Sequence, residues 1–138
     1  MKILICHDGS EKAQSALNRC MTLFGHLKPQ MILVTVVEEP LDASSHVEES
    51  FEQWRAQREA ELRQAAESVT AQGLDVDAIL AIGDPRKMLV EAVRKRMPDI
   101  LVITSRPPKG GVRFGNVTVS VSDYLLHHID VCPVLVMQ

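Results

Sequence analysis

Short apolar runs alternate along the chain with longer segments in which apolar residues recur at helical spacing. Continuous runs lie at residues 2–6, 31–37, 99–104 and 132–137, and a weaker, partly alternating run lies at 75–82. Continuous runs of this length are typical of strands buried on both faces, and the alternating run is typical of a strand at a sheet edge.

The intervening segments predict four helices, at about 10–27, 47–72, 83–98 and 120–128. Ser10 and Asp84 are suited to cap two of them, and Pro29 and Pro98 end them. Strands that alternate with helices predict a doubly wound α/β fold, with a parallel sheet covered on both faces, in one domain of residues 1–138. Ligands bind such sheets beyond the carboxyl ends of the strands, where the strand order reverses.

One segment at that edge has the composition of an anion-binding loop. The stretch "SRPPKGGVRFGNVTVSVSDY" runs from Ser105 to Tyr124 and combines glycines, hydroxyl residues and basic residues. Its part from Arg106 to Thr118 has few large apolar side chains to offset the entropy of ordering, so we expect it to be mobile without a ligand.

Composition narrows the class of protein. The chain has 138 residues, 46% of them apolar, and a formal charge of -3, which suits a globular protein and offers no basic field for nucleic acid. No apolar run approaches membrane-spanning length and no signal peptide precedes the first strand, so we expect a cytoplasmic protein. Cys6, Cys20 and Cys132 lack metal or disulfide spacing, and we interpret all three as small buried residues.

Several motifs resemble the universal stress protein family. They are "ILICHDGSEKAQSAL" at the start, "AIGDPRKMLVEAVRKRMPDILVITS" in the middle and "SVSDYLLHHIDVCPVLVM" at the end. The similarity spans essentially the whole chain in the family's order. The resemblance implies a flavodoxin-like, Rossmann-like domain with a five-stranded parallel sheet of order 3-2-1-4-5.

The phosphate loop departs from the family's pattern. ATP-binding members resemble one another in G-x2-G-x9-G-[S/T], and the three glycine positions fall here on Thr104, Pro107 and Val119, with eleven intervening residues instead of nine. Pro107 cannot donate an N–H to a phosphate. Lys109 and Arg113 remain good phosphate partners, and Gly110-Gly111 can form a different anion-binding nest.

The resemblance implies an adenine-nucleotide site, for ATP or AMP, with magnesium if the ligand is ATP. Asp8 would lie near the sugar or base, the backbone of Val36 near the adenine, and Ser120 near the phosphates. The implied candidates are Cys6, Asp8, Val36, Ile103, Thr104, Ser105, Lys109, Gly110, Gly111, Arg113, Val119, Ser120, Val121 and Ser122.

Other polar and aromatic residues have plainer interpretations. We expect His7 to be a solvated turn residue, and Phe51 and Trp54 to serve packing rather than to form a binding platform. No Ser/His/Asp arrangement and no metal-ligand spacing is present, so the sequence predicts neither a catalytic set nor a metal site.

The last strand predicts self-association. Val134, Leu135, Val136 and Met137 are uncharged, although the implied strand order puts them at a sheet edge. The same strand of a second copy, paired antiparallel about a two-fold axis, would cover that edge.

Three functions remain open. The first, which the missing glycines favour, is a homodimer with a regulatory or protective role in stress, in which nucleotide binding is weak or absent. The second is an ATP- or AMP-binding protein that uses the altered loop from Lys109 to Arg113. The third is a slow nucleotide hydrolase, which the lack of a catalytic base and of metal ligands disfavours.

Overall fold

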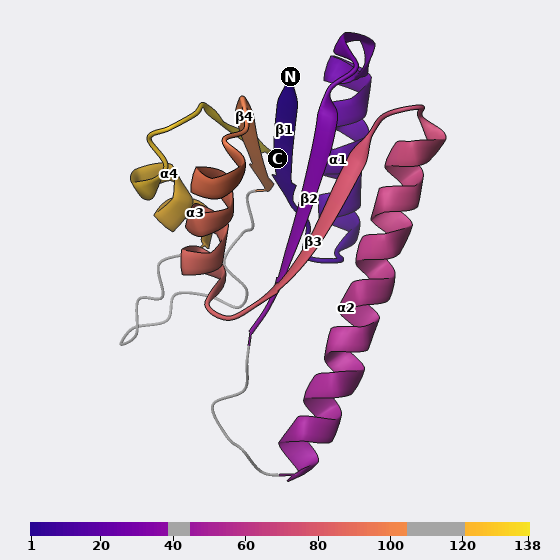
Figure 1. The fold of residues 1–138 in the computed structure, drawn as a ribbon, viewed down its shortest axis with the longest axis vertical. Coiled ribbons are helices and arrows are strands. Elements are labelled where there is room, and N and C mark those ends of the chain that lie inside the picture. The colour runs from indigo at the N-terminus through magenta and orange to yellow at the C-terminus, as the bar shows by residue number, and fades with distance from the viewer. Residues whose placement is uncertain (39–44, 105–120) are drawn as a thin grey trace.

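The fold alternates strands and helices as the hydrophobic pattern predicts (Figure 1). The computed structural model describes residues 1–38, 45–104 and 121–138, and of residues 45–49 only the backbone. The strands are β1 (Lys2–Cys6), β2 (Gln30–Val37), β3 (Val76–Ile82), β4 (Ile100–Thr104) and β5 (Val134–Met137). The helices are α1 (Glu11–Phe24), the short 3-10 helix η1 (Gly25–Leu27), α2 (Ser45–Ala71), α3 (Pro85–Arg96) and α4 (Val121–His128).

The five strands form one parallel sheet of order β3-β2-β1-β4-β5, so the expected strand order is confirmed. The order reverses at β1, because the chain adds β2 and β3 on one side of it and β4 and β5 on the other. The carboxyl ends of β1, β2 and β4 therefore meet at the switch point where such sheets bind ligands.

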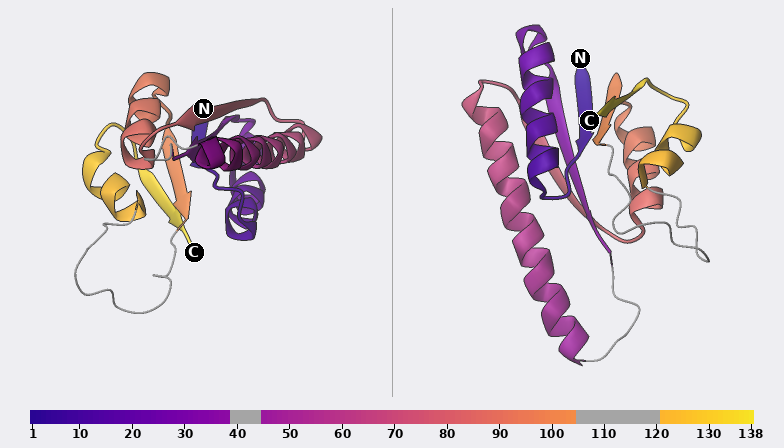
Figure 2. Two further views of the ribbon diagram at one scale, coloured as in Figure 1. Left: turned by 90° about the horizontal axis from the view of Figure 1, so that it is seen from below. Right: turned by 180° about the vertical axis from the view of Figure 1, so that it is seen from behind.

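Two hydrophobic cores cover the two faces of the sheet. One contains apolar residues of α1 and α2, among them Leu17 and Leu62, and the other contains residues of α3 and α4, among them Leu89 and Leu125. Figure 2 shows the two pairs of helices on opposite sides of the sheet. Both faces of the central strands are thus buried from solvent, which explains why the sequences of those strands are continuous apolar runs.

Helix α2 is longer than the sheet that it covers. Its carboxyl-terminal half buries Leu62, Ala65 and Val69 against the sheet. Among residues 50–61, all of them described, no side chain is fully buried. Figure 1 shows the amino-terminal half projecting past the carboxyl ends of β2 and β3. This half of α2 therefore stands beside the ligand edge of the sheet.

Candidate functional site

A cavity of about 500 Å³ opens at the switch point. Side chains from β1, β2, β4, α2, α3 and α4 line it, although these elements are distant in sequence. The lining residues are Cys6, His7, Asp8, Val34, Val36, Glu38, Trp54, Arg58, Pro85, Leu89, Ile103, Thr104, Val121, Ser122 and Leu125. Most of the lining side chains are apolar, and Asp8, Glu38, Thr104 and Ser122 add carboxylates and hydroxyls, a composition typical of small-molecule sites.

Seven candidates from the sequence are brought together in this cavity: Cys6, Asp8, Val36, Ile103, Thr104, Val121 and Ser122. The side chain of Val36 is half-buried and packs against the core beneath α3 and α4. The other seven candidates, and the segment expected to be mobile, lie outside the described residues: Ser105, Lys109, Gly110, Gly111, Arg113, Val119, Ser120 and 106–118.

The turn after β1 is held by short local hydrogen bonds. The Asp8 carboxylate accepts from the backbone N–H of Ser10 at 3.0 Å and from its hydroxyl at 2.6 Å. The Ser10 oxygen in turn accepts from the backbone N–H of Ala13 at 3.1 Å and caps α1. This arrangement directs Asp8 into the cavity and explains why an Asp and a Ser follow the strand at this spacing.

His7 is buried, not solvated, and the expectation from the sequence was wrong. Its side chain is 4% exposed because Gln14 on α1 and Thr35 on β2 enclose the turn. The Thr35 hydroxyl donates to the His7 carbonyl at 2.6 Å, and the Gly9 N–H donates to Nδ1 at 3.0 Å. Since Nδ1 accepts, Nε2 carries the proton and donates to Gln14 Oε1 at 3.2 Å. Burial lowers the pKa of His7, which keeps this neutral form.

Helix α2 closes over the same turn. Arg58 Nη1 donates to the backbone carbonyl of Asp8 and, at 2.8 Å, to Glu61 Oε2. Gly9 has φ +82°, and a Cβ built there would lie 1.7 Å from Glu61 Oε2 and 2.4 Å from Arg58 Nη1. Glycine is therefore required twice, for its backbone angle and for the approach of α2.

Trp54 lies one helical turn before Arg58 and also lines the cavity, with 40% of the residue exposed. This half of α2 projects past the carboxyl ends of β2 and β3, and Trp54 belongs to neither core cluster. The expectation that Trp54 serves packing stays a prediction. The helical stripe that predicted packing continues into Leu62, the first fully buried residue of α2 among those whose side chains are described.

At the opposite rim, α4 is tied to the end of β4. The Ser122 hydroxyl donates to the Thr104 carbonyl at 2.8 Å. This contact places the first turn of α4, with its partial positive charge, at the mouth of the cavity. The cavity thus combines the carboxylates of Asp8 and Glu38, which follow β1 and β2, with a helix N-terminus that follows β4 in the chain.

The cysteines offer no reactive thiolate. Cys20 is buried as expected, whereas Cys6 and Cys132 are partly exposed. Burial nevertheless raises the pKa of the Cys6 thiol to about 12, so the thiol that lines the cavity is protonated at neutral pH. Within residues 1–38, 45–104 and 121–138, no group of three side chains could hold a metal ion. None of the helices so described is long and apolar enough to cross a membrane.

Comparison with known proteins identifies the family. The model of the universal stress protein family matches residues 1–138. The chain belongs to the universal stress protein family. No match is found among curated proteins.

Solved universal stress proteins share the fold. One from Burkholderia pseudomallei is 23% identical, with a TM-score of 0.76 over 99% of this chain and 94% of its own. One from Arabidopsis thaliana with AMP bound is 19% identical, with a TM-score of 0.73 over 99% and 90%. One from Archaeoglobus fulgidus in complex with dAMP is 15% identical, with a TM-score of 0.70 over 100% and 98%. At these identities the structures establish the architecture alone.

Proposed function

We propose that this universal stress protein is a cytoplasmic regulatory or protective homodimer that binds a nucleoside monophosphate of the AMP class in the cavity. One observation carries the proposal: a single cavity of about 500 Å³ gathers seven residues that the family resemblance assigns to a nucleotide site. That volume falls within the roughly 300–1,000 Å³ typical of small-molecule sites. The relatives from Arabidopsis thaliana and Archaeoglobus fulgidus hold AMP and dAMP, which supports the same ligand class here.

The charges around the cavity support one orientation of the ligand. Asp8 and Glu38 line one end, where carboxylates repel a phosphate but accept hydrogen bonds from sugar hydroxyls and amino groups. Ser122 and the first turn of α4 line the other end, where a helix N-terminus favours an anion. We infer that the nucleoside lies toward Asp8 and the phosphate toward α4.

A triphosphate should gain little affinity over a monophosphate in this chain. The family's glycine positions are occupied by Thr104, Pro107 and Val119, and side chains there hinder the close backbone approach that β- and γ-phosphates need. We expect AMP to bind no more than about tenfold less tightly than ATP, about 1.4 kcal/mol, with or without magnesium.

Equilibrium dialysis of AMP, ADP and ATP against the purified protein tests this proposal. Asp8→Asn keeps the oxygen that accepts from Ser10 and removes the charge, so we expect AMP affinity to fall about tenfold without unfolding. Asp130→Asn, at an exposed position before β5, is the matched control and should bind as the unmodified protein does. Tight, magnesium-dependent ATP binding with negligible AMP affinity would contradict the proposal.

The homodimer is proposed from the properties of β5, the strand at one edge of the sheet. The strand is the last in the sheet and carries four apolar residues, Val134, Leu135, Val136 and Met137. Pairing with the same strand of a second copy would cover its backbone and the exposed parts of these side chains. Light scattering at micromolar concentration measures the mass directly, and a monomer would refute this part of the proposal.

A further inference from the structure

One aromatic side chain, that of Trp54, lines the cavity but belongs to neither hydrophobic core cluster. Trp54 lies on the half of α2 that projects past the sheet, and 40% of the residue is exposed. It nevertheless lines the cavity together with Asp8 and Glu38. A large indole that contributes to no core cluster, but faces a cavity, is available to a ligand.

The indole is held in place by its neighbours on α2. The Arg58 guanidinium carbon lies 6.0 Å from the centre of the Trp54 ring, within the range of a cation–π contact. Arg58 is itself fixed by Glu61 and by the carbonyl of Asp8. Arg58 therefore connects the turn that carries Asp8 with the part of α2 that carries Trp54, which favours one position of the indole over others.

The surroundings of Trp54 favour a flat, neutral group. Asp8 and Glu38 are negative, and among the described residues that line the cavity the one cation, Arg58, is already paired with Glu61. The cavity is also lined by aliphatic side chains of β2 and α3, such as Val36 and Leu89. A phosphate gains nothing here, whereas the ring of a purine can use both the apolar wall and an aromatic face.

We propose that Trp54 is a stacking residue that contacts the base of the bound nucleotide and raises the affinity for purine nucleotides. The inference rests on the proposed function, which supplies the ligand class, but it names a contact from α2 that the family resemblance does not assign. Arg58 is a positioning residue in this scheme, because it acts through Trp54 and the Asp8 turn.

Trp54 is the chain's single tryptophan, so its fluorescence reports on this site alone. Without ligand, iodide should quench the emission, because the indole is partly exposed. Saturation with AMP, verified by dialysis, should lower the iodide quenching constant by about half or more, since a stacked base shields one face of the ring. An unchanged quenching constant in the AMP complex would overturn the inference.

Substitutions separate stacking from helix stability. Trp54→Ala should weaken AMP binding about tenfold, and Trp54→Phe, which keeps an aromatic face, should remain within about threefold. Phe51→Ala is the matched control, because Phe51 is half-buried one turn earlier on α2 and does not line the cavity. It should bind AMP as the unmodified protein does.

The outcomes distinguish this inference from the function on which it rests. If the unmodified protein binds AMP and Trp54→Ala binds equally well, the stacking role is wrong and the proposed function stands. If Phe51→Ala loses as much affinity as Trp54→Ala, the effect belongs to the helix and the stacking role is also wrong. If the unmodified protein binds no adenine nucleotide, both the proposed function and the stacking role are wrong.

Discussion

The turn after β1 and the outer edge of β5 both carry backbone N–H and C=O groups that no neighbouring strand pairs, but their surroundings differ. In the turn, side chains from α1, β2 and α2 meet the polar groups of residues 7–10. At β5 the side chains are apolar and offer no such partners. The turn is completed by its own chain, whereas the edge of β5 is suited to another copy.

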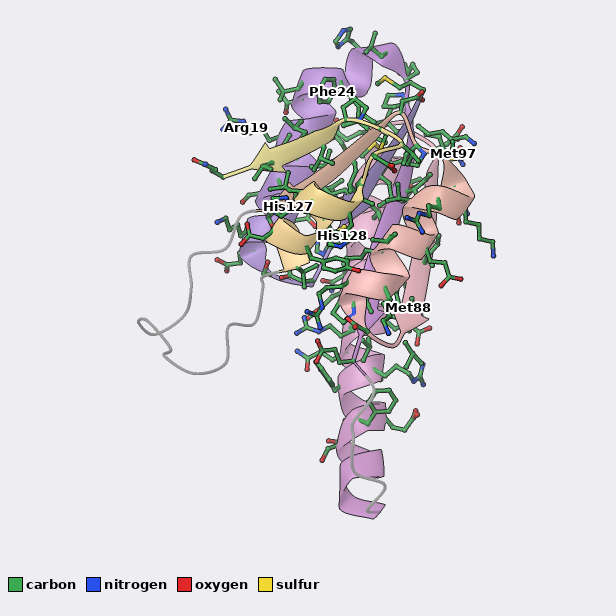
Figure 3. All side chains as sticks on the ribbon, turned by 90° about the vertical axis from the view of Figure 1, so that its left-hand side faces the viewer. Arg19, Phe24, Met88, Met97, His127 and His128 are labelled. Carbon is green, nitrogen blue, oxygen red and sulfur yellow. The ribbon has the colours of Figure 1, made fainter. Side chains whose placement is uncertain are left out.

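The register of β5 specifies which backbone groups face outward. Leu101 on β4 pairs with Val134, and its N–H donates to the Pro133 carbonyl at 3.0 Å. In a parallel ladder such a residue also accepts from the residue after its partner, Leu135. The N–H and C=O groups of Val134 and Val136 therefore face away from β4. Figure 3 shows β5 between Arg19 and Phe24 of α1 on one side and His127 of α4 on the other.

The other edge strand, β3, carries a charged residue that disfavours pairing with a second sheet. It carries Asp77, whose carboxylate pairs with Arg96 at the end of α3. Charges on an edge strand oppose pairing with a second sheet. The comparison teaches that changes in the turn should lower the stability of each chain. Changes to the outward backbone groups of β5 should act mainly on association, although the side chains of β5 also pack on the core.

The largest expected effect concerns association. Val136→Pro removes an outward N–H from both copies of a symmetric interface, so we expect dimerisation to weaken by about 2–3 kcal/mol, or roughly 30- to 150-fold. Val136→Ala keeps the N–H and should remain largely dimeric. Leu135→Lys should also weaken the dimer, but Leu135 packs partly on the core beneath α1, so its effect includes a loss of chain stability. Sedimentation equilibrium measures the association constants, and equal constants for the Pro and Ala variants would contradict the interface.

A smaller effect tests the turn against a matched glycine elsewhere. Gly9 and Gly73 have similar backbone angles, φ +82° and +76°, but a Cβ at Gly73 would meet nothing within 4 Å. Gly73→Ala should cost about 1 kcal/mol for the backbone angle alone. Gly9→Ala should cost about 2–3 kcal/mol, because the new methyl group also displaces Arg58 and Glu61. Urea unfolding measures both free energies.

A third substitution shows whether the contact with α2 causes the difference. In a Glu61→Ala background the methyl group at residue 9 has more room, so the additional cost of Gly9→Ala should shrink toward that of Gly73→Ala. Equal costs for the two glycines in the original background would show that α2 does not press on the turn.

The smallest expected effect is a pH dependence from His7. Burial lowers the pKa of His7 in the folded chain below its ordinary value of 6.5, so between these two pKa values the unfolded chain binds more protons. Stability is therefore fully present above pH 6.5 and is lost as the pH falls toward the folded pKa. The hydrogen bond that His7 donates to Gln14 and the charge of Glu61 oppose this shift, and Arg58 adds to it.

Asparagine tests that contribution, because its side-chain oxygen can replace Nδ1 as the acceptor for Gly9 and does not titrate. Between pH 7.5 and 5.5, the free energy of unfolding of His7→Asn should fall less than that of the unmodified protein. Parallel curves for the two proteins would exclude His7 as the source of the acid sensitivity.

Much of the fold was predictable because its signals are local. Apolar runs specified the buried strands, Ser10 and Asp84 cap the helices that they were expected to cap, and Gly73 follows α2 with the positive φ expected of a helix end. The weaker alternation of residues 75–82 correctly indicated an edge strand. The positions of Asp8 and Ser10 were also predictable, because these two residues form their own turn through local hydrogen bonds.

The other half of the cavity depended on contacts between distant segments. The burial of His7 requires Thr35, 28 residues away, and the wall opposite β1 requires Arg58, 50 residues from Asp8. The hydrophobic stripe of α2 specified which side of the helix is apolar, but it could not show that Leu62 is buried in the core while Trp54 lines the cavity. Periodicity determines which way a side chain points along its own element, whereas its burial is decided by what the rest of the chain brings to that place.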